Sequence, residues 1–230
     1  MAEIHLTLDV DWAPDPAIDW VASAIAEAGV KATWFVTHDS PATQRLRANP
    51  LFECGIHPNF LPGSTQGDDP EQILDHCLAL VPEAVSMRTH SLFQSTRLLD
   101  LVIATGRIRV DATMFLPGVD DLKAFAYDRP HGRLIRVPFW WEDDIEIELG
   151  RFSWSWRDLD LSGPGLRVFN FHPLHVYLNS RDFGAYRRVF AEQPADLEPY
   201  RRTGAGPQPC FLDLLAQARG GKWVRELAGI

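Results

Sequence analysis

The chain has 230 residues, of which 46% are hydrophobic and 23% charged, and its formal net charge is −9. These values are typical of a soluble globular protein with a sizeable core, and we expect residues 1–230 to form a single domain. The acidic balance disfavours nucleic acid as a partner. No stretch approaches the roughly 20 apolar residues of a membrane span.

The three cysteines are widely spread along the chain, at Cys54, Cys77 and Cys210. Their odd number argues against a complete set of disulfides, and their spacing matches no metal-type pair. The first residues, MAEIHLTLDV, contain no basic segment followed by a long apolar run, so they predict no secretory signal. We therefore expect a cytoplasmic protein.

Strand and helix patterns alternate through the first half of the chain. Apolar residues at every second position predict a strand at 3–11, and amphipathic spacing predicts a helix at 16–28. Further strands are expected at 31–37, 52–57, 84–90 and 108–112, and further helices at 42–48, 70–81 and 95–106. Such alternation is typical of a parallel sheet covered by helices, and the number of units favours a closed or nearly closed barrel.

The segment 113–165 interrupts this regularity and is predicted to be an elaborated loop over one end of the sheet. It contains one apolar strand pattern at 133–141 and an acidic run at 142–148, which we expect to be a solvated loop. Asp143 or Asp144 in this run could alternatively orient a catalytic histidine. Regular patterns then return: a strand at 167–172, helices at 182–192 and 209–220, and a final strand or short helix at 222–227.

Polar residues collect at the carboxyl ends of the predicted strands, which is the face where barrels of this kind assemble their chemistry. The first strand ends in Asp9 and Asp11. The other strand ends supply Thr37, His38, His57, Arg88, His90, Asn170, His172 and His175. A carboxylate and imidazoles that converge are typical zinc ligands, and a bound ion would acidify a water molecule. The pattern therefore indicates a hydrolytic metal site, with Asp11 as a ligand and Asp9 as a base.

Each of these residues also has a purely structural interpretation. Asp9 and Asp11 could cap the next helix or close a turn, and His57 could simply begin a loop. His172 could be a hydrogen-bonded core histidine, and Arg88 could pair with a buried aspartate. His5, deep in the first strand, is assigned to structure, while His76 and His131 are expected to be solvated. Only the joint pattern favours the metal site.

Six motifs, taken in order, resemble those of the polysaccharide deacetylases, the NodB-homology family also called carbohydrate esterase family four. They are LTLDVDW, KATWFVT, ECGIHPNF, SMRTHS, FNFHP and CFLDLLAQARGGKWVREL. The resemblance covers most of the chain, and without a secretory signal the chain resembles a divergent member of the type found in O-antigen or surface-polysaccharide biosynthesis. It implies an α/β fold, a distorted (β/α)7-type barrel, that uses a divalent metal to remove an N-acyl group from a sugar.

The resemblance also implies roles for individual residues. Asp9 would be the general base, held in place by Arg88, and His172 would be the general acid. Asp11 and His57 would bind the metal, most simply Zn²⁺, with Ni²⁺ or Co²⁺ as alternatives.

The sequence departs from the family pattern at two places. Val10 separates the two aspartates, which are usually adjacent, and Leu61 stands where the family has its second metal histidine. Asn59 is nearby, but a neutral amide is a poor zinc ligand. We expect His90 to supply the missing imidazole, with His38 as the second choice.

The expected substrate is an N-acylated amino sugar, carrying acetyl or formyl and linked to a nucleotide or a lipid. Trp140 begins a tryptophan-rich segment that could stack on sugar rings or could equally pack in the core. His38, Asn59 and His175 are further candidates for substrate contacts. Two alternatives stay open: hydrolysis of a non-sugar amide, and a non-catalytic carbohydrate-binding or scaffolding protein that has lost a full metal site.

Overall fold

The computed structural model describes residues 3–150, 153–218 and 220–230. In this part of the chain the core is a nine-stranded sheet with the order β6-β7-β5-β4-β3-β2-β1-β9-β8. The strands are β1 (Ile4–Asp9), β2 (Ala32–Val36), β3 (Phe52–Ile56), β4 (Ser86–Met87), β5 (Val110–Asp111), β6 (Phe125–Arg129), β7 (Gly132–Arg136), β8 (Trp141–Glu142) and β9 (Arg167–Phe171).

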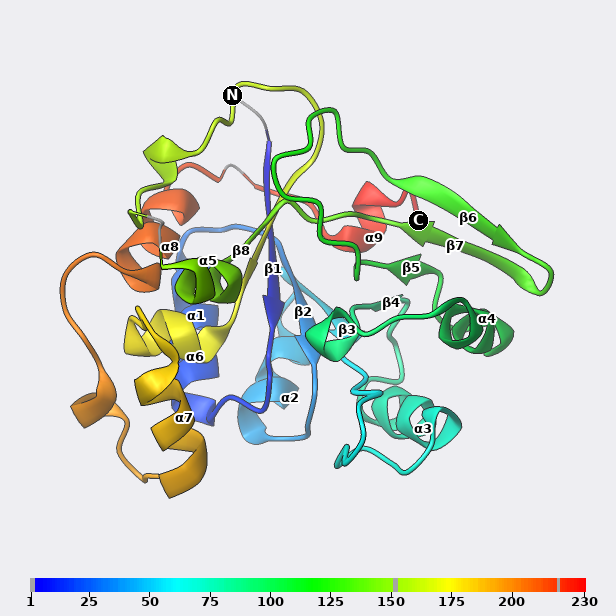
Figure 1. The fold of residues 1–230 in the computed structure, drawn as a ribbon, viewed down its shortest axis with the longest axis horizontal. Coiled ribbons are helices and arrows are strands. Elements are labelled where there is room, and N and C mark those ends of the chain that lie inside the picture. The colour runs from blue at the N-terminus through cyan, green and yellow to red at the C-terminus, as the bar shows by residue number, and fades with distance from the viewer. Residues whose placement is uncertain (1–2, 151–152, 219) are drawn as a thin grey trace.

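Neighbouring strands pair in parallel, except that β6 and β7 form an antiparallel hairpin at one edge. The sheet curls into a half-barrel with helices around its outside (Figure 1). Strand β1 lies between β2 and β9, and all of its residues are buried. The fold class predicted from the sequence is therefore confirmed.

Two helices of the first half begin at residues whose side chains cap them. Asp69 accepts a hydrogen bond from the backbone N–H of Gln72, and Ser95 accepts one from that of Leu98. Both therefore satisfy amide groups that a helix start leaves unpaired. The helices of the first half are α1 (Asp15–Glu27), α2 (Pro41–Ala48), α3 (Pro70–Leu80) and α4 (Thr96–Ala104).

The prediction of a solvated loop at 142–148 is wrong. Glu142 ends β8, and the following residues form α5 (Asp143–Leu149). Glu142 and Asp143 are 5% and 0% exposed. Asp143 and Ile147 lie one turn apart on the buried face of the helix. The other acidic residues of α5 can therefore face outward while Asp143 points inward; they are Asp144, Glu146 and Glu148.

The predicted strand at 133–141 is divided between β7 and β8, and the hairpin partner β6 was not predicted. The stretch 222–227 contains the short helix α9 (Val224–Leu227). A helix directly after β9 was also not predicted. The remaining helical elements are η1 (His90–Leu92), η2 (Trp156–Asp158), α6 (Pro173–Leu178), α7 (Phe183–Glu192), η3 (Glu198–Tyr200) and α8 (Pro207–Leu215).

Among the described residues, no helix combines the length and the apolar character needed to cross a lipid bilayer.

A buried carboxyl group, Glu53, links three segments of the fold away from the polar strand ends. Its oxygens accept hydrogen bonds from Thr33 Oγ1 at 2.9 Å, from Ser86 Oγ at 2.9 Å and from the backbone N–H of Arg225 at 3.2 Å. Burial raises the pKa of Glu53 above its ordinary value of 4.5, and these hydrogen bonds only partly offset that effect. The native state therefore binds this proton more tightly than the unfolded chain does.

We expect Glu53 to make the free energy of unfolding fall as the pH rises above 4.5, because the folded protein must then ionise a buried acid. Glu53→Gln should remove that slope in denaturant titrations at a series of pH values. Glu53→Ala should instead lose about 1–3 kcal/mol, since buried donors lose their acceptor. Glu71→Gln, at an exposed position of α3, is the control. Parallel pH curves for wild type and Glu53→Gln would contradict the argument.

Candidate metal centre and active site

The polar residues predicted at the strand ends lie at one end of the half-barrel. Asp9 is the last residue of β1, and Asp11 follows two residues later. His57 directly follows β3, and His172 directly follows β9. Because β3, β2, β1 and β9 are consecutive in the sheet, their carboxyl ends bring these side chains to a common place.

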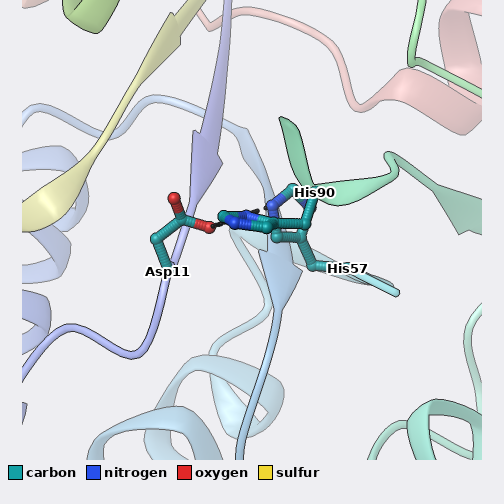
Figure 2. Close-up of side chains that lie close together, drawn as sticks. All are labelled: Asp11, His57 and His90. Atoms are coloured by element: carbon teal, nitrogen blue, oxygen red, sulfur yellow. Dashed lines mark hydrogen bonds and ion pairs between the residues drawn. The ribbon is translucent and has the colours of Figure 1, made fainter. Parts of the chain in front are cut away.

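The side chains of His57 and His90 converge on one carboxylate oxygen of Asp11 (Figure 2). Oδ1 of Asp11 lies 3.0 Å from Nε2 of His57 and 3.0 Å from Nδ1 of His90. Burial alone would raise the pKa of Asp11, but the hydrogen bonds from the two histidines hold it well below its usual value. The carboxylate is therefore ionised.

The donor set fits a first-row divalent cation. The three candidate ligand atoms all lie within 4.8 Å of one another. Zinc bonds of about 2.0–2.1 Å in a tetrahedron place ligand atoms roughly 3.3 Å apart, close to the separations seen here. His57 Nδ1 donates to the backbone carbonyl of Arg88 at 2.7 Å, which leaves Nε2, the ring nitrogen that faces Asp11 Oδ1, to bind a cation in place of its proton. A carbonyl partner for the second ring nitrogen is typical of metal-binding histidines.

His90 reaches this place by a route that differs from the strand predicted at 84–90. The strand β4 ends at Met87, and His90 begins the 3-10 turn η1. The backbone is left-handed at Ser91 and Leu92, as it is at Asp11 and Trp12 (φ 52°, 53°, 45° and 54°). Non-glycine residues rarely adopt this conformation, and it clusters at functional sites. The alternative ligand, His38, hydrogen-bonds Thr37 Oγ1 at 3.0 Å and is absent from the metal-like groups among the described residues.

Asp9 is held by a buried network beside the three candidate ligands. Its Oδ1 accepts from Arg88 Nη1 at 3.0 Å, and its Oδ2 accepts from Asn170 Nδ2 at 2.9 Å. Arg88 is fully buried and also donates to Thr7 Oγ1 and to the carbonyl of Ala112. Burial alone would raise the pKa of Asp9, but the positive charge of Arg88 outweighs it and lowers the pKa. The geometry thus keeps Asp9 ionised and fixed in direction.

His172 forms a pair with Asp143 beside Asp9. Its Nδ1 donates to Asp143 Oδ1 at 2.7 Å, and its backbone N–H donates to Oδ2 at 3.0 Å. Burial alone would lower the pKa of His172, but the charges of Asp143 and Asp144 hold it well above its usual value. Nε2 lies 3.8 Å from Asp11 and 4.0 Å from Asp9. The sequence left open whether Asp143 or Asp144 orients the histidine, and the hydrogen-bond partner of His172 is Asp143.

The remaining candidates for substrate contacts occupy other surroundings. Trp140 is 9% exposed, packs against Phe169 and lies under Arg167 at the beginning of β9, so it belongs to the core and is not available to stack on a sugar. Asn59 closes its own turn by accepting from the backbone N–H of Leu61. His175 is 1% exposed, and burial lowers its pKa well below the usual value.

The structural histidines follow expectation. His5 is 2% exposed in β1, and burial lowers its pKa to about 4. His76 and His131 are exposed.

A hollow of about 550 Å³ opens beside the candidate ligands. It is lined by Asp11, Trp12, His90, Tyr186, Arg187, Phe190 and Ala191. A larger hollow of about 930 Å³, beside Trp154, Asn179 and Arg201, includes none of the converging residues. We therefore take the smaller hollow as the candidate substrate site, because two of the three candidate ligands, Asp11 and His90, line it.

Sequence reasoning missed Thr7, and it placed Asn170 at a strand end without predicting its role in the network around Asp9. Thr7 lies two residues before Asp9 and therefore shares its side of β1, and Asn170 bears the same relation to His172 on β9. That alternation was the available signal. The contributions of Trp12 and of α7 depend on tertiary packing and had no local signal.

Comparison with known proteins agrees with this fold. The WbmS-like polysaccharide deacetylase family model matches residues 6–190. The crystal structure of a Bordetella bronchiseptica polysaccharide deacetylase assigned to O-antigen biosynthesis is 36% identical, covers 94% of this chain and 90% of that chain, and has a TM-score of 0.82. Peptidoglycan deacetylase PdaC from Bacillus subtilis has the same fold at 13% identity, with 99% of this chain and 92% of that chain covered and a TM-score of 0.54.

A comparison with curated proteins finds no match. The family model nevertheless spans most of the chain and includes the segments that carry Asp9, Asp11, His57, His90 and His172. The chain belongs to the WbmS-like polysaccharide deacetylase family.

Proposed function

We propose that this protein is a metal-dependent hydrolase that removes an N-acyl group, acetyl or formyl, from an amino sugar in surface-polysaccharide or O-antigen biosynthesis. The observation that carries the proposal is the convergence of His57 and His90 on Asp11, beside the Asp9–Arg88 pair. The assignment of the Bordetella relative to O-antigen biosynthesis supports the biological context.

Asp11, His57 and His90 would hold the cation, most simply Zn²⁺, with Ni²⁺ or Co²⁺ as alternatives. When bound, a divalent cation at this place would polarise the acyl carbonyl and acidify a water molecule.

Asp9 would act as the general base. It takes one proton from the attacking water while the water oxygen forms a bond to the acyl carbon. Arg88 and Asn170 each hold one carboxylate oxygen of Asp9, and the charge of Arg88 keeps Asp9 ionised before the reaction begins. Arg88 is thus a positioning residue that keeps the base charged and correctly aimed.

His172 would act as the general acid. Asp143 holds the Nδ1 proton, so the proton available for transfer is on Nε2, which faces Asp9 and Asp11. As the carbon–nitrogen bond breaks, the leaving nitrogen takes this proton. The products are an amine and a carboxylic acid, which releases its proton to solvent and becomes a carboxylate. The proton held on Asp9 leaves through solvent, and solvent restores the proton of His172.

The proposed substrates are nucleotide- or lipid-linked amino sugars, and the proposed location is the cytoplasm. The support for the location is chemical: Cys54, Cys77 and Cys210 are all buried and free, as in proteins of reducing compartments.

The direct test is release of acetate or formate from N-acylated sugars, sugar phosphates and nucleotide sugars by zinc-loaded protein. Release that requires metal supports the proposal. Stoichiometric sugar binding with no release from any of these compounds would favour the non-catalytic alternative. Release from simple non-sugar amides alone would favour the other alternative, a hydrolase of different substrates.

Asp143→Asn is expected to lower turnover about 10–100-fold, the usual effect of losing a partner that orients a functional histidine. The variant also removes the charge that raises the pKa of His172, so the protonated acid should be lost at a lower pH. The alkaline side of the pH–rate profile should therefore move toward acidic pH, which a merely structural role would not cause. Asp144→Asn is the control, because it removes a neighbouring charge but keeps the hydrogen bond between Asp143 and His172. An unshifted profile for Asp143→Asn would remove Asp143 from the mechanism.

A further inference from the structure

We propose that the substrate of this site carries an anionic group, a carboxylate or a phosphate, and that Arg187 binds it. The inference rests on the proposed function, because it assigns a substrate class to the same hollow. It is carried by the position of one arginine at the rim of the candidate metal centre.

Arg187 and the candidate ligands line the same hollow. Asp11 and His90 contribute to one part of it, and α7 contributes Tyr186, Arg187, Phe190 and Ala191. The volume, about 550 Å³, lies within the range of about 300–1,000 Å³ that is typical of small-molecule sites. A sugar whose N-acyl group lies against Asp11 and His90 would therefore present its other substituents to α7.

Arg187 has no carboxylate within 4 Å in the part of the chain that the structure describes. Four arginines beside other hollows do have one: Arg45 with Asp19, Arg47 with Glu83, Arg201 with Glu198 and Arg202 with Asp182. The guanidinium of Arg187 instead lies over the ring of Phe183, 5.7 Å from its centre. A ring face carries no carboxylate oxygen, so the N–H groups of Arg187 can still bind an external anion.

The guanidinium is carried by a well-anchored element. Tyr186, the preceding residue of α7, stacks on the buried His175 with ring centres 4.5 Å apart. His175 in turn contacts His172 edge-on at 5.7 Å. The position of α7 is thus tied through packed rings to the proposed general acid, and Arg187 keeps a defined place relative to it.

The chemistry of the wall suits a charged sugar. Trp12, Tyr186 and Phe190 offer aromatic surface for the apolar face of a pyranose ring. A guanidinium forms paired hydrogen bonds with the two oxygens of a carboxylate or phosphate. Because the overall field of an acidic protein repels anions, a local cation is what would allow such a substrate to bind.

The test compares three probes on zinc-loaded protein: N-acetylglucosamine, N-acetylglucosamine 1-phosphate and an N-acetylhexosaminuronic acid. Binding is measured by calorimetry in an Asp9→Asn background, and acyl release is measured in parallel with Asp9 present. We expect at least one anionic probe to bind about 10–100-fold more tightly than the neutral sugar, the range for a hydrogen bond to a charged group. Arg187→Gln should bring this ratio to about one.

Arg188→Gln is the matched control, because its guanidinium lies over Tyr200 and is not part of the hollow. It should keep the ratio. A preference for phosphate alone or for carboxylate alone supports the inference and identifies the source of the anion. Equal affinity for all three probes in the Asp9→Asn protein, or an unchanged ratio in Arg187→Gln, overturns it. Selective anion binding without acyl release would support the role of Arg187 and reject the proposed function. Acyl release from neutral and anionic probes with equal KM would support the proposed function and reject the role of Arg187.

Discussion

Alanine at His90 is expected to abolish stoichiometric metal binding and, with it, acyl release. The structure places Nδ1 of His90 at 3.0 Å from the carboxylate that also contacts His57, so the variant leaves only two of the three proposed protein ligands. We expect zinc affinity to fall by about a hundred-fold or more, at least as much as loss of an outer-shell partner costs. Metal content after dialysis against a weak chelator, together with a zinc titration, measures this directly.

The matched control is His38→Ala, which removes another histidine from a strand end without touching the three converging residues. Its metal content should equal that of the wild type. Circular dichroism of both variants separates loss of metal from loss of the fold. If His90→Ala retains full zinc and His38→Ala does not, the proposed ligand set is wrong.

Asp9→Asn is expected to lower kcat about 10²–10⁴-fold while the protein keeps its metal. This is the usual contribution of a positioned general base. Asparagine has nearly the same size and can still face Arg88 and Asn170, but it cannot accept a proton from water. Because the buried Arg88 also loses its charged partner, the thermal midpoint must be recorded, and rates must be measured well below it.

Asp15→Asn is the control, because it makes the same chemical change outside the hollow. The carboxylate of Asp15 accepts a hydrogen bond from the backbone N–H of Ala42. The variant should leave kcat unchanged within about two-fold, as is usual for surface substitutions away from special features. Equal kcat values for Asp9→Asn and wild-type protein would exclude Asp9 as the base.

Most of the fold and of the site was predictable because both follow from strand periodicity. Alternation in β1 places Thr7 and Asp9 on one side, and parallel strands bring their carboxyl ends together wherever they lie in the sequence. Asp9, Asp11, His57 and His172 could therefore be brought together before any coordinates were known. The departure at Leu61 also pointed to a ligand from elsewhere.

The parts that were not predictable depend on contacts between distant elements. His90 was expected within a strand at 84–90, yet β4 ends at Met87 and His90 begins the turn η1, whose next two residues are left-handed. The acidic run at 142–148 looked solvated because its composition is charged, whereas the pairing of Asp143 with His172 stabilises its burial. Arg187 lines the hollow because the fold brings α7 near Asp11 and His90, and no local pattern encodes that.

The origin of the three converging side chains has a consequence for how the apoprotein behaves. Asp11 and His90 are 79 residues apart in the chain, and His57 comes from a third segment between them. A cation bound by all three residues would close two long loops of the chain, whereas a site with two of its ligands in one short motif would close only one long loop. Closing these loops lowers the conformational entropy of the unfolded chain, so metal binding would be coupled to folding. Refolding with and without zinc would then differ most in the segments between β1 and α4.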